Sequence, residues 1–174
     1  MIIETERLQL IPLTSPQLQL WIEDLHALEK ELGCVYRAEP MEGLFLDIVR
    51  SQFERTKNDE DHYMYHNFWF LIRISDRVVV GAADFKDIPN ERNEVEIGYG
   101  LGKEFEHQGY MTEAVHAMCE WALSQEEVAC VLAETYVDGF ASQRVLKRCG
   151  FMPHKNEKSE SIEKSKDTLW WIVM

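Results

Sequence analysis

Residues 94–111, E-V-E-I-G-Y-G-L-G-K-E-F-E-H-Q-G-Y-M, decide the fold. The first eight alternate, with acids at 94 and 96 on one face and apolar side chains on the other, which predicts a strand. The glycines at 98, 100 and 102 weaken a strand and fit a place where a ligand comes close. Helical spacing resumes at 111, so the loop leads directly into a helix N-terminus, whose free N–H groups and dipole favour an anion. Pyrophosphate is the anion that we expect there.

Two other phosphate-binding motifs are excluded. A dinucleotide site needs G-x-G-x-x-G between strand and helix, but Lys103 stands at the last required glycine and the helix starts too late. The chain also contains no G-x-x-x-x-G-K-[ST] sequence, which excludes a P-loop.

The N-terminal part predicts a strand and a helix. Residues 4–12 alternate, and Pro12 ends the strand. Ser15 and Pro16 predict an N-cap followed by proline at the first helical position. Apolar residues at helical spacing then continue one helix to Gly33, which is a plausible stop.

The rest of the chain alternates between helical and strand patterns. A second helix is predicted over 41–57, ended by the polar stretch 58–61. The inward residues expected on it are Leu44, Ile48, Val49 and Phe53. Further strands are predicted at 67–74, 77–85, 128–136 and 168–174, helices at 111–124 and 141–149, and a polar loop at 154–166. The expected order is β-α-α-β-β-β-α-β-α-β-β, an α/β (α+β) fold in one domain, 1–174, with a mixed, mostly antiparallel sheet flanked by helices.

Composition narrows the classes of partner. The chain has 174 residues, is 45% hydrophobic and carries a net charge of −13. It is therefore long enough to bury a core, and its charge argues against nucleic acid and against an anionic membrane. The first residues are acidic, unlike a signal peptide, and no uncharged apolar stretch approaches the roughly 18 residues of a membrane span. Four scattered cysteines fit reduced thiols in the cytoplasm and no metal site.

Three separated motifs carry a resemblance to a known family. E-I-G-Y-G-L (96–101), H-Q-G-Y-M-T-E-A (107–114) and A-S-Q-R-V-L-K-R-C-G-F (141–151) occur in the order seen in GNAT-superfamily N-acetyltransferases. The opening E-T-E-R-L-Q-L (4–10) resembles the first strand of the RimJ/RimL-like branch. The resemblance implies a GNAT-like fold and transfer of acetyl from acetyl-CoA to an amine, either a protein N-terminus or a small molecule.

The resemblance also implies which residues hold acetyl-CoA. The family's pyrophosphate pattern falls on 106–111, where Gly109 matches, while Glu106 replaces a basic or amide residue and Met111 a small one. In the second motif Ser142 matches and Gly139 replaces an asparagine. Leu146 occupies the position where other branches of the family have a tyrosine that protonates the departing thiolate. The expected cofactor-binding residues are Ile97, Gly98, Tyr99, His107, Gln108, Gly109, Tyr110, Met111, Thr112 and Ser142, and Lys103 is a further candidate for the side-chain contact that Glu106 does not supply.

The chemistry of amine acetylation needs a base, an oxyanion donor and proximity. Glu96 is the predicted base, acting through a water, and Glu94 on the same face is the alternative. The noncatalytic interpretation is that both acids belong to a solvated face of the strand. The resemblance places the oxyanion donor at a backbone N–H around 97–99 and makes Ser142 a second catalytic candidate. A noncatalytic CoA-binding or interaction module is the alternative function, because Glu106, Gly139 and Leu146 depart from the family pattern.

Two features remain outside this site. His62 and His66 have i, i+4 spacing but lack the glutamate and third ligand of a zinc motif, so we expect a surface or acceptor-side role. The closing strand, with Trp170 and Trp171, is apolar; as an exposed sheet edge it would favour a homodimer.

Overall fold

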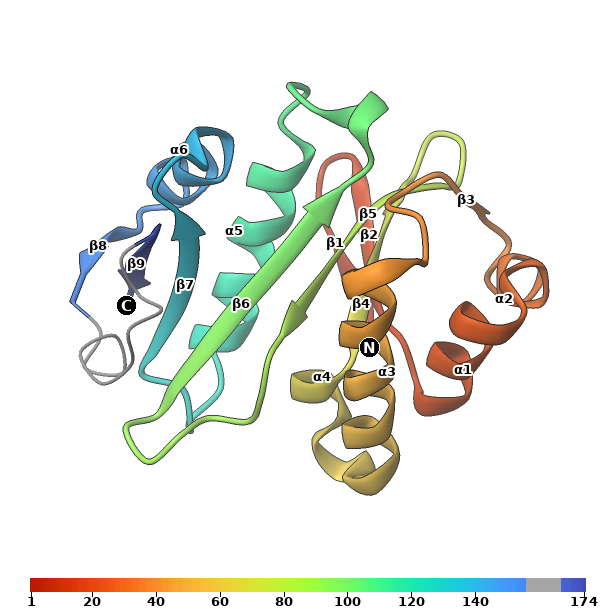
Figure 1. Ribbon diagram of the computed structural model, residues 1–174, viewed down its shortest axis with the longest axis horizontal. Coiled ribbons are helices and arrows are strands. Elements are labelled where there is room, and N and C mark those ends of the chain that lie inside the picture. Colours follow the sequence, from red (N-terminus) through yellow and green to blue (C-terminus); the bar gives the residue numbers. More distant parts are fainter. Residues whose placement is uncertain (156–166) are drawn as a thin grey trace.

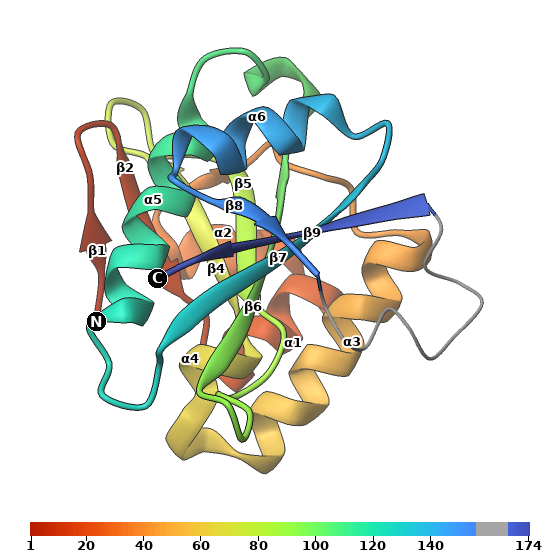
Figure 2. The same ribbon diagram turned by 90° about the vertical axis from the view of Figure 1, so that its left-hand side faces the viewer.

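The computed structural model describes residues 1–155 and 167–174, so most of the predicted loop, 156–166, lies outside the described residues. Within them one nine-stranded sheet has helices on both faces (Figures 1 and 2). The elements are β1 (Ile3–Glu4), β2 (Leu8–Pro12), α1 (Ser15–Glu23), α2 (Leu25–Leu32), β3 (Val35–Tyr36), α3 (Gly43–Asn58), η1 (Glu60–His62), α4 (Tyr63–His66), β4 (Phe68–Arg73), β5 (Val78–Phe85), β6 (Glu94–Leu101), η2 (Lys103–Phe105), α5 (Tyr110–Leu123), β7 (Cys130–Tyr136), α6 (Phe140–Arg148), β8 (Met152–His154) and β9 (Thr168–Val173).

The sheet is mixed and mostly antiparallel, as predicted. Its order is β1-β2-β4-β5-β6-β7-β9-β8, with β3 beside β5. Among the described strands, two pairs run parallel, β6 with β7 and β3 with β5. The helices predicted at 41–57, 111–124 and 141–149 match α3, α5 and α6 within two residues at each end.

Two hydrophobic cores lie on opposite faces of the sheet. Strand β4 contributes to both, because its side chains alternate between the faces. Phe68, Phe70 and Ile72 pack with residues of α1, α2 and α3. Trp69 and Leu71 pack with α5 on the other face. A strand buried on both sides explains why this stretch is continuously apolar.

The first helical segment differs from its prediction at its start and in its interior. Thr14, not Ser15, is the N-cap, and it forms a reciprocal capping box with Gln17. The single helix predicted up to Gly33 is two helices, broken at Asp24, whose carboxylate caps α2. The stop is confirmed, since Gly33 has φ of 61°, a left-handed conformation that glycine adopts without strain.

Helix α3 exposes two residues that its apolar pattern places inside. Val49 is fully buried as predicted, but Leu44 is 75% exposed and Ile48 is also exposed. The prediction is wrong for these two because this face of α3 lines a hollow and does not pack on the sheet.

The closing strand is not the edge of the sheet. Strand β8, which residue patterns alone do not locate, pairs outside β9, and Trp171 is only 3% exposed. The prediction that the closing strand forms an exposed sheet edge is therefore wrong. The homodimer stays a prediction, but it loses the support of that edge.

Strands β6 and β7 part soon after they begin. Their ladder covers only 94–96 against 130–132. Beyond it the two strands diverge in a V, which Figure 1 shows with α5 behind the opening. The backbone groups of β6 that face β7 are thus freed from residue 97 onward.

None of the helices in the described ranges has the length and hydropathy that crossing a membrane requires. The four cysteines are all buried and free.

Candidate active site

Two hollows open on either side of β6 and share Tyr99 and Gly100 in their walls. The larger, of about 680 Å³, lies between α3 and strands β5 and β6; we call it the α3 hollow. The smaller, of about 420 Å³, lies between the start of α5 and α6; we call it the α5 hollow. Both volumes suit small-molecule ligands, which typically occupy about 300–1,000 Å³.

The α5 hollow is built to receive an anion. His107 and Gly109 both have positive φ, 62° and 82°, so the backbone turns sharply just before α5 begins. Gly109 is the N-cap and offers no side chain to cap α5. The first-turn N–H groups of α5 are thus left for a ligand, and the helix dipole adds positive potential.

Two arginines strengthen this site. Arg144 and Arg148, one turn apart on α6, line the α5 hollow, where Glu106 is also present but exposed. The residues fit a pyrophosphate, since backbone donors and guanidinium groups converge on one space. Sequence reasoning did not single out these arginines, although their i, i+4 spacing after Ser142 is the signal that would have found them.

The loop is held by the N-terminal segment. The Glu113 carboxylate accepts hydrogen bonds from Thr5 Oγ1 (2.5 Å), Arg7 N (2.7 Å) and Arg7 Nε (2.7 Å). Arg7 Nη1 donates to the Gln108 carbonyl (2.8 Å), and its guanidinium lies 4.4 Å from the centre of the Tyr110 ring. Burial raises the pKa of Glu113, but the bonds from Thr5 and Arg7 outweigh it and the net pKa is lowered. Glu113 is therefore an anion at neutral pH.

A pair of hydroxyl groups spans the opening between β6 and α6. Ser142 Oγ donates to Tyr99 Oη at 2.8 Å, and Tyr99 Oη donates to the Ser142 carbonyl at 3.3 Å. Burial raises the pKa of Tyr99 to about 12, with the bond from Ser142 opposing it. Leu146 is fully buried in the core, so it presents only hydrocarbon. The Tyr99–Ser142 pair supplies hydroxyl groups where the two hollows meet.

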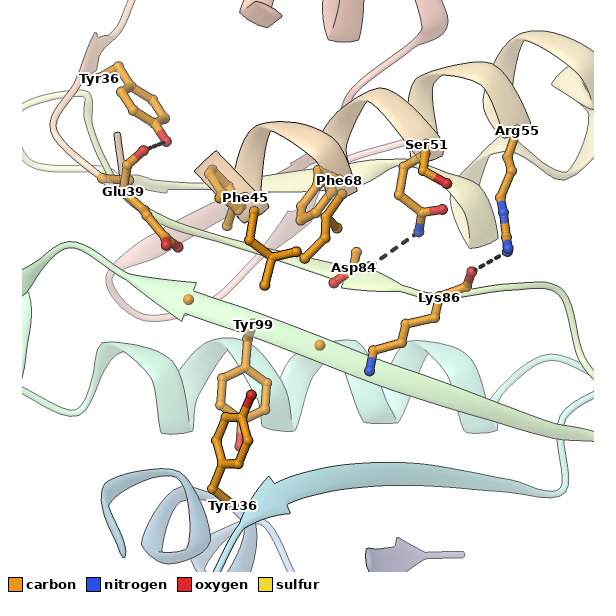
Figure 3. Close-up of a pocket in the computed structure, with 17 residues that line it drawn as sticks. Tyr36, Glu39, Phe45, Ser51, Arg55, Phe68, Asp84, Lys86, Tyr99 and Tyr136 are labelled. Carbon is orange, nitrogen blue, oxygen red and sulfur yellow. Dashed lines mark hydrogen bonds between the residues drawn. The ribbon is translucent and has the colours of Figure 1, made fainter. Parts of the chain in front are cut away.

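The α3 hollow combines apolar walls with a few charges (Figure 3). Five aromatic rings and the two exposed aliphatic residues of α3 form much of its lining. Its acidic and basic side chains are Glu39, Arg55, Asp84 and Lys86, of which Asp84 lies on β5. The lining residues used below are Glu39, Phe45, Gln52, Arg55, Asp84, Lys86, Gly98 and Tyr99.

The predicted base lies beside this hollow. Glu96 Oε1 is ion-paired with Lys86 Nζ, and the Glu96 side chain is 25% exposed. Glu96 and Glu94 both line a separate depression that Trp170 also borders. The Lys86 ammonium therefore connects Glu96 with the α3 hollow.

Most of the predicted cofactor-binding residues come together. The residues Tyr99, His107, Gly109, Tyr110, Met111, Thr112 and Ser142 all line the α5 hollow. Gly98 lines the α3 hollow, and the Ile97 side chain is buried in the core. Gln108 lies outside the lining, and its side chain donates to the Glu104 carbonyl at 3.0 Å. Lys103 lies outside it too.

The two histidines contact a shared aspartate. His62 Nδ1 and His66 Nε2 lie 2.9 and 3.0 Å from Asp59 oxygens, and these hydrogen bonds lower the pKa of Asp59. In the part of the chain that the structure describes, no three His, Cys, Asp or Glu residues are grouped so as to hold a metal ion.

A family model described as "Acetyltransferase (GNAT) domain" matches residues 7–152, which include both hollows. The chain belongs to the GNAT acetyltransferase family. It is accordingly an acetyl-CoA-dependent N-acetyltransferase, in the RimJ/RimL-type group that its motifs indicate.

Similar proteins agree in fold and in length. The uncharacterized N-acetyltransferase YjdG of Bacillus subtilis is 28% identical over 156 residues, 89% of this chain and 92% of that protein. RimL, a ribosomal L7/L12 alpha-N-protein acetyltransferase solved with coenzyme A, shares 18% identity at a TM-score of 0.66, covering 100% of this chain and 98% of that one. A ribosomal-protein-S5-alanine acetyltransferase from Vibrio fischeri shares 16% at 0.68, covering 100% and 96%. The solved structures support the predicted single α+β GNAT fold.

Proposed function

We propose that the GNAT domain transfers acetyl by direct attack of a primary amine on acetyl-CoA while both are bound. The observation that carries this proposal is the wall that the two hollows share at Tyr99 and Gly100. The α5 hollow takes the pyrophosphate, and the α3 hollow takes the amine. Their contact at β6 brings the two reactants together, which removes much of the entropic barrier.

The chain's own groups have distinct parts in this reaction. The loop and helix start at 107–112 hold the pyrophosphate through backbone N–H groups. A freed backbone N–H around 97–99, where the β6–β7 ladder has ended, stabilises the oxyanion. The Ser142 hydroxyl, which lines the α5 hollow and is hydrogen-bonded to Tyr99 of the shared wall, steadies the departing thiolate. A coenzyme A thiol leaves readily, because thiol pKa values lie near 8.5.

The acceptor is either a protein N-terminus or a small amine. RimL acts on a ribosomal protein, and a spermidine N-acetyltransferase from Vibrio cholerae, in chimeric form, shares the fold at a TM-score of 0.65. Both acceptors present a primary amine, which suits the α3 hollow because its walls are largely apolar and include the carboxylates of Glu39 and Asp84. The four free, buried cysteines support a cytoplasmic setting.

The experiment has two parts. Thiol release from acetyl-CoA is measured with spermidine, 2-phenylethylamine and peptides beginning with alanine or serine. Thermal unfolding is measured with and without coenzyme A, which should stabilise the fold by about 2.7 kcal/mol at a hundredfold excess over Kd. Absence of a melting shift at millimolar coenzyme A would contradict the assignment of the α5 hollow. Binding without turnover on every amine would favour a noncatalytic module.

A further inference from the structure

Asp84 is an acid buried in the wall of the α3 hollow. It lies on β5 opposite Gly98 of β6 and is only 5% exposed. Figure 3 shows its carboxylate between α3 and β6, in the middle of the lining. An ionisable group is rarely buried this far without a partner or a function.

One carboxylate oxygen of Asp84 lacks a partner. Oδ2 accepts a hydrogen bond from Gln52 Nε2 at 3.2 Å, and the same nitrogen donates to the Phe85 carbonyl. Within residues 1–155 and 167–174, Oδ1 has no hydrogen-bond partner. A Cβ added to Gly98 would lie 2.6 Å from Oδ1, so this oxygen sits directly against β6. Oδ1 is not one of the fully enclosed unpaired atoms of the described residues, so it opens onto the hollow and can accept a hydrogen bond from a ligand.

The cations around Asp84 are engaged by other acids. Lys86, which directly follows β5, is paired with Glu96, and Arg55 of α3 is paired with Asp87 at 2.9 Å. Glu39, the other acid of the lining, is exposed. Burial raises the pKa of Asp84 to about 6; Lys86 and Gln52 oppose this rise, and Glu96 adds to it. The carboxyl is thus ionised at neutral pH and holds a proton more readily than an ordinary aspartate.

We propose that Asp84 Oδ1 binds the ammonium group of the acceptor and takes its proton. This role rests on the proposed function and makes Asp84 a catalytic residue of that reaction. One ammonium proton moves to Oδ1, and the nitrogen lone pair then forms a bond to the thioester carbonyl carbon. The carbon–sulfur bond breaks with its electron pair on sulfur, which receives the second amine proton. Asp84 returns its own proton to water.

Geometry distinguishes Asp84 from the predicted base, Glu96. Asp84 lines the α3 hollow, whereas Glu96 lines the neighbouring depression and has one oxygen tied to Lys86. In this arrangement Glu96 acts through Lys86, because it neutralises the ammonium that would otherwise pair with Asp84. Glu96 is then a positioning residue and its effect on the reaction is indirect.

The test compares pH profiles of kcat/KM for wild type, Asp84→Asn, Glu96→Gln and Asp47→Asn, using whichever amine of the panel turns over fastest. Wild-type kcat/KM should rise with pH through about 6, as Asp84 ionises. Asp84→Asn should lower kcat/KM at pH 7 by about 10²–10⁴-fold and remove that rise, with the loss shrinking toward the pKa of the free amine. Asp47, an exposed aspartate of α3, is the matched control and should change neither.

Glu96→Gln separates the two carboxylates. If Asp84 is the base, freeing Lys86 shifts the acidic rise to lower pH and leaves kcat/KM at pH 7 within about tenfold of wild type. A 10²–10⁴-fold loss in Glu96→Gln, with Asp84→Asn and Asp47→Asn active, would instead support Glu96 and overturn the proposal.

Two further readouts keep the outcomes distinct. Asp84→Asn should retain its melting shift with coenzyme A, because Asp84 is outside the α5 hollow. If Asp84→Asn does not fold, the pH profile of wild-type kcat/KM decides alone. A profile without a rise near pH 6 contradicts the role of Asp84 as the base. Full activity of Asp84→Asn overturns the role while the proposed function stands. A wild type that acetylates no amine overturns both.

Discussion

Replacing Glu113 by glutamine should loosen the fold and the cofactor loop together. The amide keeps one oxygen for Thr5 Oγ1 and Arg7 N but turns an NH₂ group toward Arg7 Nε, where a carboxylate oxygen now accepts at 2.7 Å. Loss of one charge-assisted hydrogen bond destabilises by about 1.5–3 kcal/mol. Arg7 is 39% exposed, so water replaces part of this bond and we expect the lower half of that range.

The expected shift is measurable by thermal unfolding. For a chain of this size 1 kcal/mol corresponds to about 2–4 °C in Tm, so Glu113→Gln should lower Tm by about 3–9 °C at pH 7. Kd for coenzyme A should rise as well, since Arg7 also holds the Gln108 carbonyl. The control is Glu120→Gln on the same helix, whose carboxylate is 71% exposed and should shift Tm by less than about 2 °C.

The pH dependence gives an independent check of the same variant. The folded-state pKa of Glu113 is lowered, so its contribution is present above the unfolded pKa and is lost as pH falls through the folded one. The Tm gap between wild type and Glu113→Gln should therefore close in acid. Equal Tm values for the Glu113 and Glu120 variants at pH 7, or a gap that persists in acid, would refute the reasoning.

Three further predictions concern the α5 hollow and assembly. Gly109→Val, at φ of 82°, should abolish the coenzyme A melting shift, whereas Gly43→Val, at φ of 57° and with open space for a Cβ, should cost about 1–2 kcal/mol of stability and keep the shift. Changing both arginines of α6 in this hollow to glutamine should raise Kd for coenzyme A by at least tenfold in calorimetry; Lys147→Gln, which removes a cation over the Trp171 ring, is the control. Sedimentation at micromolar concentration should show a homodimer, and a monomer alone would contradict that expectation.

Local patterns predicted most of the fold because they report burial. The alternation in β6 and the apolar run of β4 follow from which faces the sheet buries. The helix end at Gly33 was predictable because glycine readily adopts the left-handed conformation of a C-cap. Leu44 and Ile48 could not be placed in the same way. A hollow and a core both select apolar side chains, and periodicity does not distinguish them.

The candidate site was predictable where a motif names its residues and not where tertiary pairing decides. Gly109 and Ser142 belong to motifs and line the α5 hollow. Asp84 belongs to no motif, and its burial depends on α3, which is more than 25 residues away in the chain. The pairing of Glu96 with Lys86 likewise depends on the register between two strands.

The shared wall at Tyr99 and Gly100 has a consequence for steady-state kinetics. Each hollow has its own lining apart from that wall, so neither substrate has to pass through the other's site to bind. A ping-pong route would need an enzyme nucleophile to carry the acetyl group, yet all four thiols are buried and burial raises their pKa values. Initial-rate plots at several fixed amine concentrations should therefore give intersecting lines, and either substrate should be able to bind first.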